Sequence, residues 1–128
     1  MKSKKVILVT GASSGIGKDT ALKLVSEGNV VYGAARRLVN MEDFVQAGGR
    51  SIKMDITNHK EVEAAVEKII SEQGHIDVLI NNAGFAVYGS VEDITIDEAR
   101  QQFEVNIFGL GRITQLVIPY MRARNKGK

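Results

Sequence analysis

The 128-residue sequence has the composition of an ordinary globular domain, with 44% hydrophobic and 25% charged residues. Its net charge of +2 is too small to favour nucleic acid or an anionic membrane as a partner, and its lack of cysteine excludes disulfides, zinc–thiolate sites and cysteine nucleophiles. The opening residues MKSKK are followed only by VILV, which is too short an apolar run for a signal peptide, and no window suits a membrane span. These features predict one soluble, cytoplasmic domain over residues 1–128.

Predicted strands and helices alternate from the start of the chain. A β-branched run at residues 5–9 is typical of a buried strand that leads into a glycine turn. A helical repeat of apolar residues comes next and ends at Gly28. Residues 30–35 are the second predicted strand, and residues 40–47 fit a short helix.

The alternation continues with a third predicted strand at residues 51–54. Either Thr57 or Asn58 can cap the next helix, which ends at Gly74. Residues 76–80 form the fourth predicted strand. Because the strands are nearly continuous apolar runs, we expect a parallel sheet that is covered on both faces.

One long helix is predicted at the end of the chain, from Thr95 to about Arg124. Thr95 and Glu98 have the spacing of a capping box. The predicted core-facing stripe of this helix consists of Ala99, Phe103, Leu110, Ile113 and Val117. The expected fold is therefore α/β: a Rossmann-type doubly wound parallel sheet of four strands in the order 3-2-1-4, with flanking helices, that stops before a fifth strand.

The segment TGASSGIG places three glycines between the first strand and the first helix: Gly11, Gly15 and Gly17. A pyrophosphate needs close backbone approach, positive φ in the turn and free N–H groups at a helix start, and glycine permits all three. The spacing does not match a P-loop, and Asp19 stands where a magnesium-binding hydroxyl belongs. A plain connecting turn remains the alternative.

Two arginines come directly after the second strand, at the position where dinucleotide-binding α/β folds contact the adenosine ribose. A carboxylate there would bind the ribose hydroxyls, but the chain has Ala35, followed by Arg36 and Arg37. Guanidinium groups suit bidentate contact with a 2′-phosphate, so NADP is favoured over NAD. Alternatively, both arginines are solvated loop charges.

Polar residues also mark the ends of the third and fourth strands. Asp55 can accept a hydrogen bond from an adenine amino group or cap the following turn. The small residues after Asn82 leave room for a ribose and nicotinamide, and the Asn82 amide can tie neighbouring strand ends together, with a plain turn as the alternative. Asn106 lies within the apolar stripe of the last helix, where an amide must find partners. It can hold water, bend the helix, or be satisfied by nearby backbone.

Taken in order, TGASSGIG, Asp55, NNAG at residues 81–84 and VNIFG around Asn106 resemble the short-chain dehydrogenase/reductase family along essentially the whole chain. The resemblance implies an NADP(H)-dependent oxidoreductase that interconverts carbonyls and alcohols, with Asn106 in a catalytic Asn, Ser, Tyr, Lys tetrad and no metal. It also implies cofactor contacts from Gly11, Ser13, Ser14, Gly15, Ile16, Gly17, Arg36, Arg37, Asp55, Ile56, Asn82, Ala83 and Gly84.

The other three members of the family's tetrad have no counterpart in these residues. None of Tyr32, Tyr88 and Tyr120 is followed four residues later by lysine. We therefore expect an amino-terminal fragment that is inactive alone, because the tyrosine is the family's general acid/base. The alternative is a non-catalytic NADP(H)-binding or interaction module.

Self-association, or binding of another chain, is also expected. The fourth strand would be an apolar edge, and Ile107, Phe108 and Ile118 lie off the core-facing stripe of the last helix. Members of the resembled family commonly form dimers through the matching helix. The expected partners are thus a nicotinamide dinucleotide, a small carbonyl or alcohol substrate, and further copies of the chain.

Overall fold

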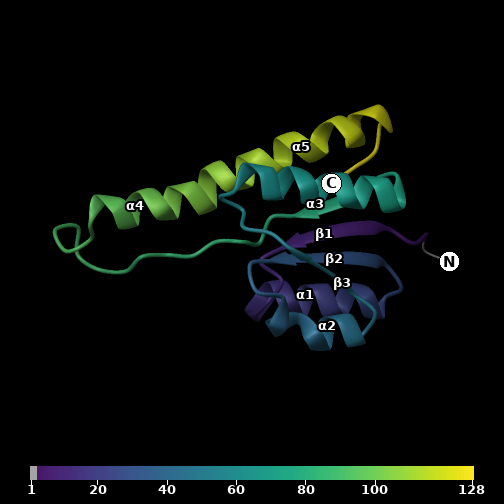
Figure 1. Ribbon diagram of the computed structural model, residues 1–128, viewed down its shortest axis with the longest axis horizontal. Helices are drawn as coiled ribbons and strands as arrows, with labels where there is room; N and C mark the ends of the chain where they lie inside the picture. Colours follow the sequence, from purple (N-terminus) through teal and green to yellow (C-terminus); the bar gives the residue numbers. More distant parts are fainter. Residues whose placement is uncertain (1–2) are drawn as a thin grey trace.

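The computed structural model describes residues 3–128, and a parallel four-stranded sheet forms its centre (Figure 1). The strands are β1 (Val6–Thr10), β2 (Val30–Ala35), β3 (Arg50–Lys53) and β4 (Val78–Ile80). Their order in the sheet is β3-β2-β1-β4, which confirms the predicted order. The bounds of β1, β3 and β4 differ from the predicted bounds by one or two residues.

Helices cover both faces of the sheet. The two layers are built from α1 (Gly15–Ser26), a 3-10 turn (Leu38–Met41), α2 (Glu42–Gln46), α3 (His59–Gln73), α4 (Ile96–Phe103), a π-helical turn (Glu104–Gly109) and α5 (Leu110–Ala123). Figure 1 shows α1 and α2 on one face, and α3 and α5 on the other. The predicted helix at residues 40–47 is therefore a 3-10 turn followed by α2.

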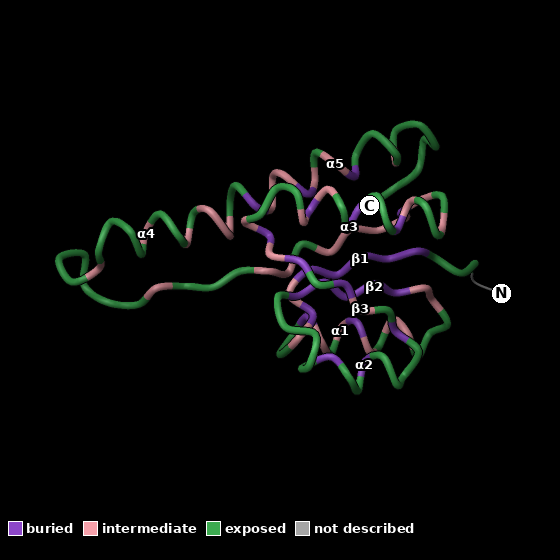
Figure 2. The backbone as a smooth tube through the Cα atoms, in the orientation of Figure 1, coloured by how far each residue is buried: buried purple, intermediate pink, exposed green. Residues whose placement is uncertain are grey.

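The core consists of two apolar layers because side chains of a strand point alternately to opposite faces. In β1, Leu8 packs with residues of the α3 and α5 layer, including Val66 and Ile113. Its neighbour Val9 packs on the other side with the layer of α1 and α2, including Phe44. The strands accordingly run through the buried centre of the molecule (Figure 2).

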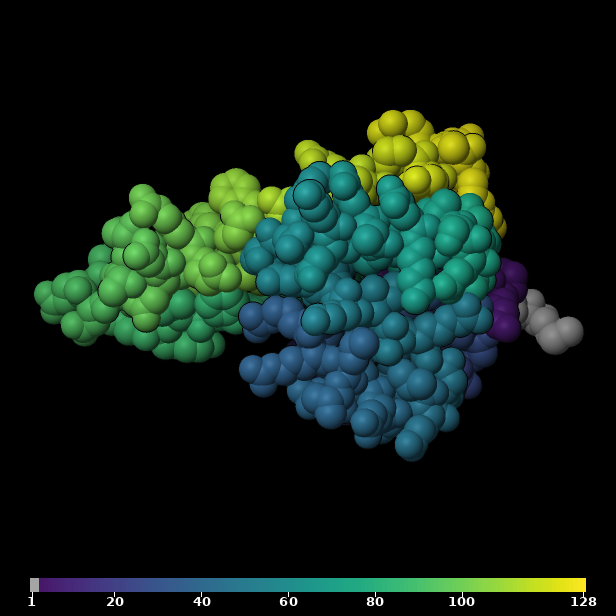
Figure 3. Space-filling model, viewed as in Figure 1, coloured from purple at the N-terminus to yellow at the C-terminus, as the bar shows by residue number. Residues whose placement is uncertain are grey.

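The extent of the last helix is as predicted, because α4, the π turn and α5 follow one another without a gap, but its geometry and its buried face depart from the prediction. The capping box at Thr95 and Glu98 is present, but the α-helical pattern gives way to the π turn after Phe103. Helix α4 has no buried residue, and Phe103 is 55% exposed, so its predicted place in the core is wrong. Together with the loop before it, α4 projects beyond the sheet as a separate lobe (Figure 3).

Lys128 pairs with the outer edge of β4. Its N–H donates to the carbonyl oxygen of Asp77 at 3.0 Å, and its carbonyl oxygen accepts from the N–H of Leu79 at 2.9 Å. The expected open edge of β4 is thus partly paired at this level of the sheet. Within residues 3–128, no helix has the length and apolar character needed to cross a membrane.

Candidate functional site

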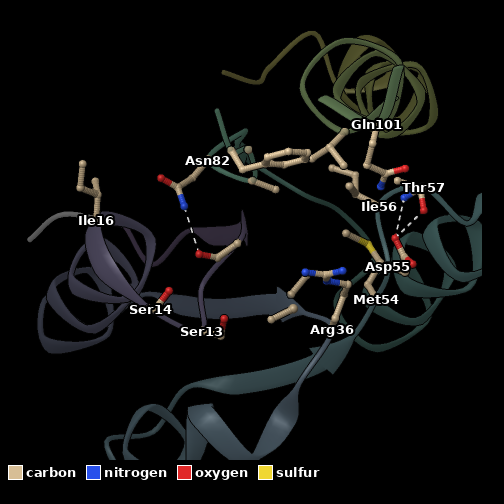
Figure 4. A pocket seen from close by; sticks show the side chains of 17 residues that line it. Ser13, Ser14, Ile16, Arg36, Met54, Asp55, Ile56, Thr57, Asn82 and Gln101 are labelled. Atoms are coloured by element: carbon tan, nitrogen blue, oxygen red, sulfur yellow. Dashed lines mark hydrogen bonds between the residues drawn. The ribbon is translucent and has the colours of Figure 1, made fainter. Parts of the chain in front are cut away.

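A cavity of about 620 Å³ lies where β1, β2, β3 and β4 end, between the start of α1 and the region of α4 and the π turn (Figure 4). We call it the edge cavity. Ten of the predicted site residues line it: Gly11, Ser13, Ser14, Ile16, Arg36, Asp55, Ile56, Asn82, Ala83 and Gly84. This is the crevice at the carboxyl ends of strands where open α/β sheets bind ligands.

Four predicted site residues are absent from this lining. Gly15, Gly17 and Arg37 adjoin lining residues in the chain, and Asn106 comes directly after the lining residue Val105. The lining also contains residues that the sequence did not single out for binding, which are Ala34, Met54, Thr57, Gln101 and Val105. Gln101 and Val105 belong to the last helix, in α4 and in the π turn respectively.

The glycine turn forms a cradle beside α1. Gly11 and Gly15 have φ values of +66° and +56°, which favour glycine, and a β-carbon on Gly15 would meet nothing within 4 Å. A β-carbon on Gly17 would instead collide with the Asn82 amide and the Gly11 carbonyl oxygen. The backbone therefore packs closely on the β4 side and stays open at Gly15.

The first turn of α1 offers unpaired donors to this cradle. Ser14 is the N-cap residue, but its side chain makes no capping hydrogen bond. The first N–H groups of a helix have no intrahelical partner, and the helix dipole makes this end favourable for anions. An open glycine, free N–H groups and a positive helix end fit a dinucleotide's pyrophosphate.

Thr10 joins the ends of β1 and β4, a role that the sequence did not reveal. Its buried hydroxyl donates to the Ile80 carbonyl oxygen at 3.4 Å and accepts from the N–H groups of Asn82 and Ala83 at 3.1 and 3.0 Å. The Asn82 amide in turn donates to the Gly11 carbonyl oxygen at 3.1 Å. The sequence feature that could have indicated this role is a threonine at the end of an apolar strand, directly before a glycine.

Asp55 forms a local turn and remains available at the edge cavity. Its Oδ1 accepts from the N–H and the hydroxyl of Thr57 at 2.9 and 2.7 Å. Hydrogen bonding from Thr57 lowers the pKa of Asp55, partial burial opposes this, and the positive charge of Arg36 lowers the pKa further. Asp55 thus caps the short turn at Thr57, whereas the cap of α3 (His59–Gln73) is Asn58, whose side chain accepts from the N–H of Glu61. The Asp55 carboxylate still faces the cavity in Figure 4.

The two arginines after β2 differ in position. Ala35 is buried at the end of β2, whereas Arg36 and Arg37 are exposed. Only Arg36 lines the edge cavity, and Figure 4 shows its guanidinium near Asp55. Arg37 precedes the 3-10 turn. A guanidinium at the cavity rim can bind an anionic group of a ligand.

Asn106 holds the loop after β4. Its Oδ1 accepts from the N–H of Phe85 at 3.0 Å, and its Nδ2 donates to the carbonyl oxygen of Phe85 at 2.7 Å. The residue lies within the π turn, so the helix is distorted around it. Of the alternatives that the sequence left open, satisfaction of the Asn106 amide by backbone therefore occurs.

Within residues 3–128, no tyrosine lines the edge cavity. Tyr32 is buried against Glu72, Tyr88 is 91% exposed on the loop before α4, and Tyr120 lies near the far end of α5. Among the cavity-lining residues of this described part of the chain, the ionisable side chains are Arg36 and Asp55. The arrangement is suited to binding a nucleotide, and Asp55 is held ionised by its surroundings.

Comparisons with known proteins agree with this arrangement. A sequence model of the family described as short chain dehydrogenase matches residues 5–128. The chain is 45% identical over 97% of its length to a 3-ketodihydrosphingosine reductase of Bacteroides thetaiotaomicron, covering 45% of that protein. It is 36% identical over 96% of its length to an NADP-dependent 3-hydroxy acid dehydrogenase of Schizosaccharomyces pombe, covering 51% of that protein.

The fold comparison gives the same result. The crystal structure of a short-chain dehydrogenase from Streptomyces avermitilis superimposes with a TM-score of 0.94 at 39% identity, covering 98% of this chain and 47% of the other. The chain thus spans about half the length of the relatives that it matches. With the glycine cradle and strand-end cavity described above, the match over residues 5–128 shows that the chain belongs to the short-chain dehydrogenase/reductase family.

Proposed function

We propose that residues 1–128 form the NADP(H)-binding half of an oxidoreductase that interconverts a carbonyl and an alcohol. The observation that carries this proposal is the edge cavity, where the glycine cradle of α1 faces Arg36 and Asp55. The cradle provides backbone donors and a positive helix end for a pyrophosphate. The nicotinamide dinucleotide, when bound, supplies the hydride chemistry.

Each lining group has a proposed part in holding the dinucleotide. The turn from Gly11 to Gly17 receives the phosphates and adjoining ribose, and Asp55 and Ile56 receive the adenine. The strip from Asn82 to Gly84 receives the ribose beside the nicotinamide. Arg36, with Arg37 beside it, receives the 2′-phosphate, because two guanidinium groups attract a dianion that a carboxylate at Ala35 would repel.

The proton-transfer step needs residues outside this chain. The polypeptide has no tyrosine at the edge cavity among residues 3–128, and none of its three tyrosines has a lysine four residues later. Asn106 is the only member of the expected tetrad that the chain supplies, and it holds the backbone of Phe85. We therefore propose that the 128-residue polypeptide alone does not turn over substrate.

The relatives suggest a substrate class for the whole protein. The names of the Bacteroides and Schizosaccharomyces proteins both refer to a compound with a keto or hydroxyl group at carbon 3. We propose that the whole protein reduces a 3-oxo group or oxidises the corresponding 3-hydroxyl group. The name of the Schizosaccharomyces relative also supports NADP as the cofactor.

Self-association is proposed as well, through the surface of the last helix. Four large apolar residues are exposed there and project from α4, the π turn and α5: Phe103, Ile107, Phe108 and Ile118. We call them the helix patch. Monomeric proteins seldom leave large contiguous apolar areas in water, so this surface favours a second copy of the chain.

Steady-state kinetics test the proposed activity. The whole protein is assayed with NADPH and with NADH over matched 3-oxo, 2-oxo and simple ketone substrates. We expect turnover with NADPH, a smaller kcat/KM with NADH, and preference for the 3-oxo series. The purified 128-residue chain serves as the second arm and should show no turnover above buffer. Turnover by this chain, or inactivity of the whole protein on every carbonyl, would contradict the proposal.

A further inference from the structure

Arg112 joins three segments that meet behind the edge cavity. It lies on α5, and its Nη1 donates to the carbonyl oxygen of Ile56 at 3.2 Å. Its Nη2 lies 3.4 Å from Oε1 of Glu104, the first residue of the π turn. The Arg112 side chain is 24% exposed, so its charge is partly shielded from water. One guanidinium thus holds the loop after β3 and the start of the π turn together.

Direct backbone packing reinforces this junction. Gly109, the last residue of the π turn, is buried, and a β-carbon there would lie 3.0 Å from Cγ1 of Ile56 and 3.1 Å from its carbonyl oxygen. Because glycine has no side chain, the backbone of the π turn packs directly on Ile56. Movement of the loop at Ile56 must displace the π turn or break the contact with Arg112.

The other side of the π turn holds the loop after β4. Asn106 binds both backbone polar groups of Phe85, and a β-carbon on Gly84 would lie 3.1 Å from the Asn106 Oδ1. Ile56 and Phe85 both line the edge cavity, and they belong to the loops after β3 and β4 respectively. The π turn therefore connects the walls of the cavity on these two sides.

The loop at Ile56 is itself stiff. Asp55 accepts two hydrogen bonds from Thr57, and its N–H donates to Oε2 of Glu61 at 2.7 Å. A stiff loop passes a displacement to its contacts, whereas a slack one absorbs it. The guanidinium fork can also bond two acceptors at once, which the ammonium of a lysine at the same place does with poorer geometry.

We propose that Arg112 is a positioning residue that couples the adenine side of the edge cavity to the π turn that carries Asn106. Occupation of the Asp55 and Ile56 side by an adenine nucleotide then steadies the π turn and, through Asn106, the loop at Phe85. This inference rests on the proposed function, since it takes Ile56 to face the adenine. It adds a residue outside the cavity lining.

Hydrogen exchange with a ligand that lacks nicotinamide tests this coupling. The whole protein is titrated with adenosine 2′,5′-bisphosphate, and exchange of amides in the π turn is followed by mass spectrometry at saturation. In the parent protein we expect ligand-dependent slowing in the π turn. In Arg112→Met this slowing should disappear while slowing in the glycine turn persists, and affinity should fall about tenfold.

Two further variants separate coupling from folding. Arg112→Lys keeps the charge and should retain part of the slowing with an unchanged melting temperature. Arg122→Met removes an exposed arginine from the last turn of the same helix and should behave as the parent.

Three results would overturn the coupling. The first is full slowing of π-turn exchange in Arg112→Met. The second is a lower melting temperature of Arg112→Met while the slowing of π-turn exchange stays intact. The third is a parent protein that binds the bisphosphate without any change of exchange in the π turn. Failure of the parent to bind the bisphosphate at saturating concentration would instead contradict the proposed function, and the coupling with it.

Discussion

Gly17 shows how strictly the glycine cradle limits side chains. A β-carbon at this position would meet the Asn82 amide and the Gly11 carbonyl oxygen, which are both held in the joint between β1 and β4. The sequence motif predicted that glycine was needed here. It did not indicate that the neighbour would be Asn82, because that contact joins residues far apart in the chain.

Gly17→Ala should lower the free energy of unfolding by about 1 to 3 kcal/mol, because the added methyl group displaces backbone that cannot easily move. Gly111→Ala is the matched control. A β-carbon at Gly111 meets nothing within 4 Å, so alanine should stabilise the helix by about 0.5 to 1 kcal/mol. Urea unfolding of both variants measures this. Equal effects of the two substitutions would show that Gly17 is not sterically required.

Cofactor preference is the second prediction at the residue scale. Changing Ala35 to Asp and Arg36 to Leu together removes the guanidinium at the cavity and adds a carboxylate at the end of β2. The carboxylate should repel a 2′-phosphate and bind ribose hydroxyls, so preference should pass from NADP to NAD. The ratio of the two kcat/KM values for the whole protein measures the change. An unaltered ratio would show that Arg36 is a solvated side chain that does not contact the 2′-phosphate.

Elements were predictable where a local pattern fixed them. The capping box at Thr95 and the turn after Ala35 depend on neighbouring residues. The π turn was not predicted, because the predicted stripe assumed one helical period from Ala99 to Val117. A π turn adds a residue to the turn and shifts the helical phase of the residues after it. Phe103 and Gln101 precede the π turn, so this shift does not account for them. Phe103 was expected inside and lies outside because α4 projects beyond the sheet. Gln101 in α4 and Val105 in the π turn line the cavity through tertiary contacts that the sequence does not indicate.

Asp77 ties three elements at the opposite end of the sheet. Its carboxylate accepts from the N–H of Val6 at 2.8 Å and from Arg124 at 3.0 Å, and it lies 3.2 Å from Nε2 of His75. No local pattern indicates this tie, because Val6, Asp77 and Arg124 are distant in the sequence.

Acid should weaken this tie. Burial alone would raise the pKa of Asp77, but the hydrogen bonds from Val6 and Arg124 and the nearby positive charges outweigh it and lower the pKa. Stability from the ionised carboxylate is therefore complete above the ordinary pKa near about 4 and is lost as the pH falls through the lowered folded-state value. Asp77→Asn should cost about 1 to 3 kcal/mol at neutral pH and progressively less below about pH 4.

Unfolding at neutral and acidic pH measures the effect of Asp77→Asn. Asp97→Asn is the control, because the Asp97 side chain is 95% exposed and its substitution should change little at either pH. A deficit for Asp77→Asn that is the same at both pH values would mean that the ionised carboxylate is not what stabilises the tie.

At the scale of the whole molecule, the order of the sheet was predictable and the projecting lobe was not. Short apolar strands, intervening helices and right-handed connections leave few topologies for the first four strands. Nothing local in residues 84 to 103 indicates that α4 stands away from the sheet, since its capping box and apolar spacing suit a packed helix. Likewise, the pairing of Lys128 with β4 depends on tertiary contacts.

The helix patch should make the chain self-associate. We expect sedimentation equilibrium to give a mass above 13.9 kDa at tens of micromolar, because association removes exposed apolar side chains from water. Phe108→Glu should shift the equilibrium towards monomer. Val39→Glu, which changes another exposed apolar residue beside α2, should leave it unchanged. A monomeric parent, or equal effects of both substitutions, would show that the helix patch is not the contact between copies of the chain.

The crystal structure of the whole protein with NADP+ tests most directly whether the edge cavity is the dinucleotide site. We predict the pyrophosphate within hydrogen-bonding distance of N–H groups between Gly15 and Gly17, at about 2.7 to 3.2 Å. The adenine should lie beside Asp55 and the 2′-phosphate against Arg36. A dinucleotide bound outside the edge cavity, or a 2′-phosphate turned away from Arg36, would contradict this assignment.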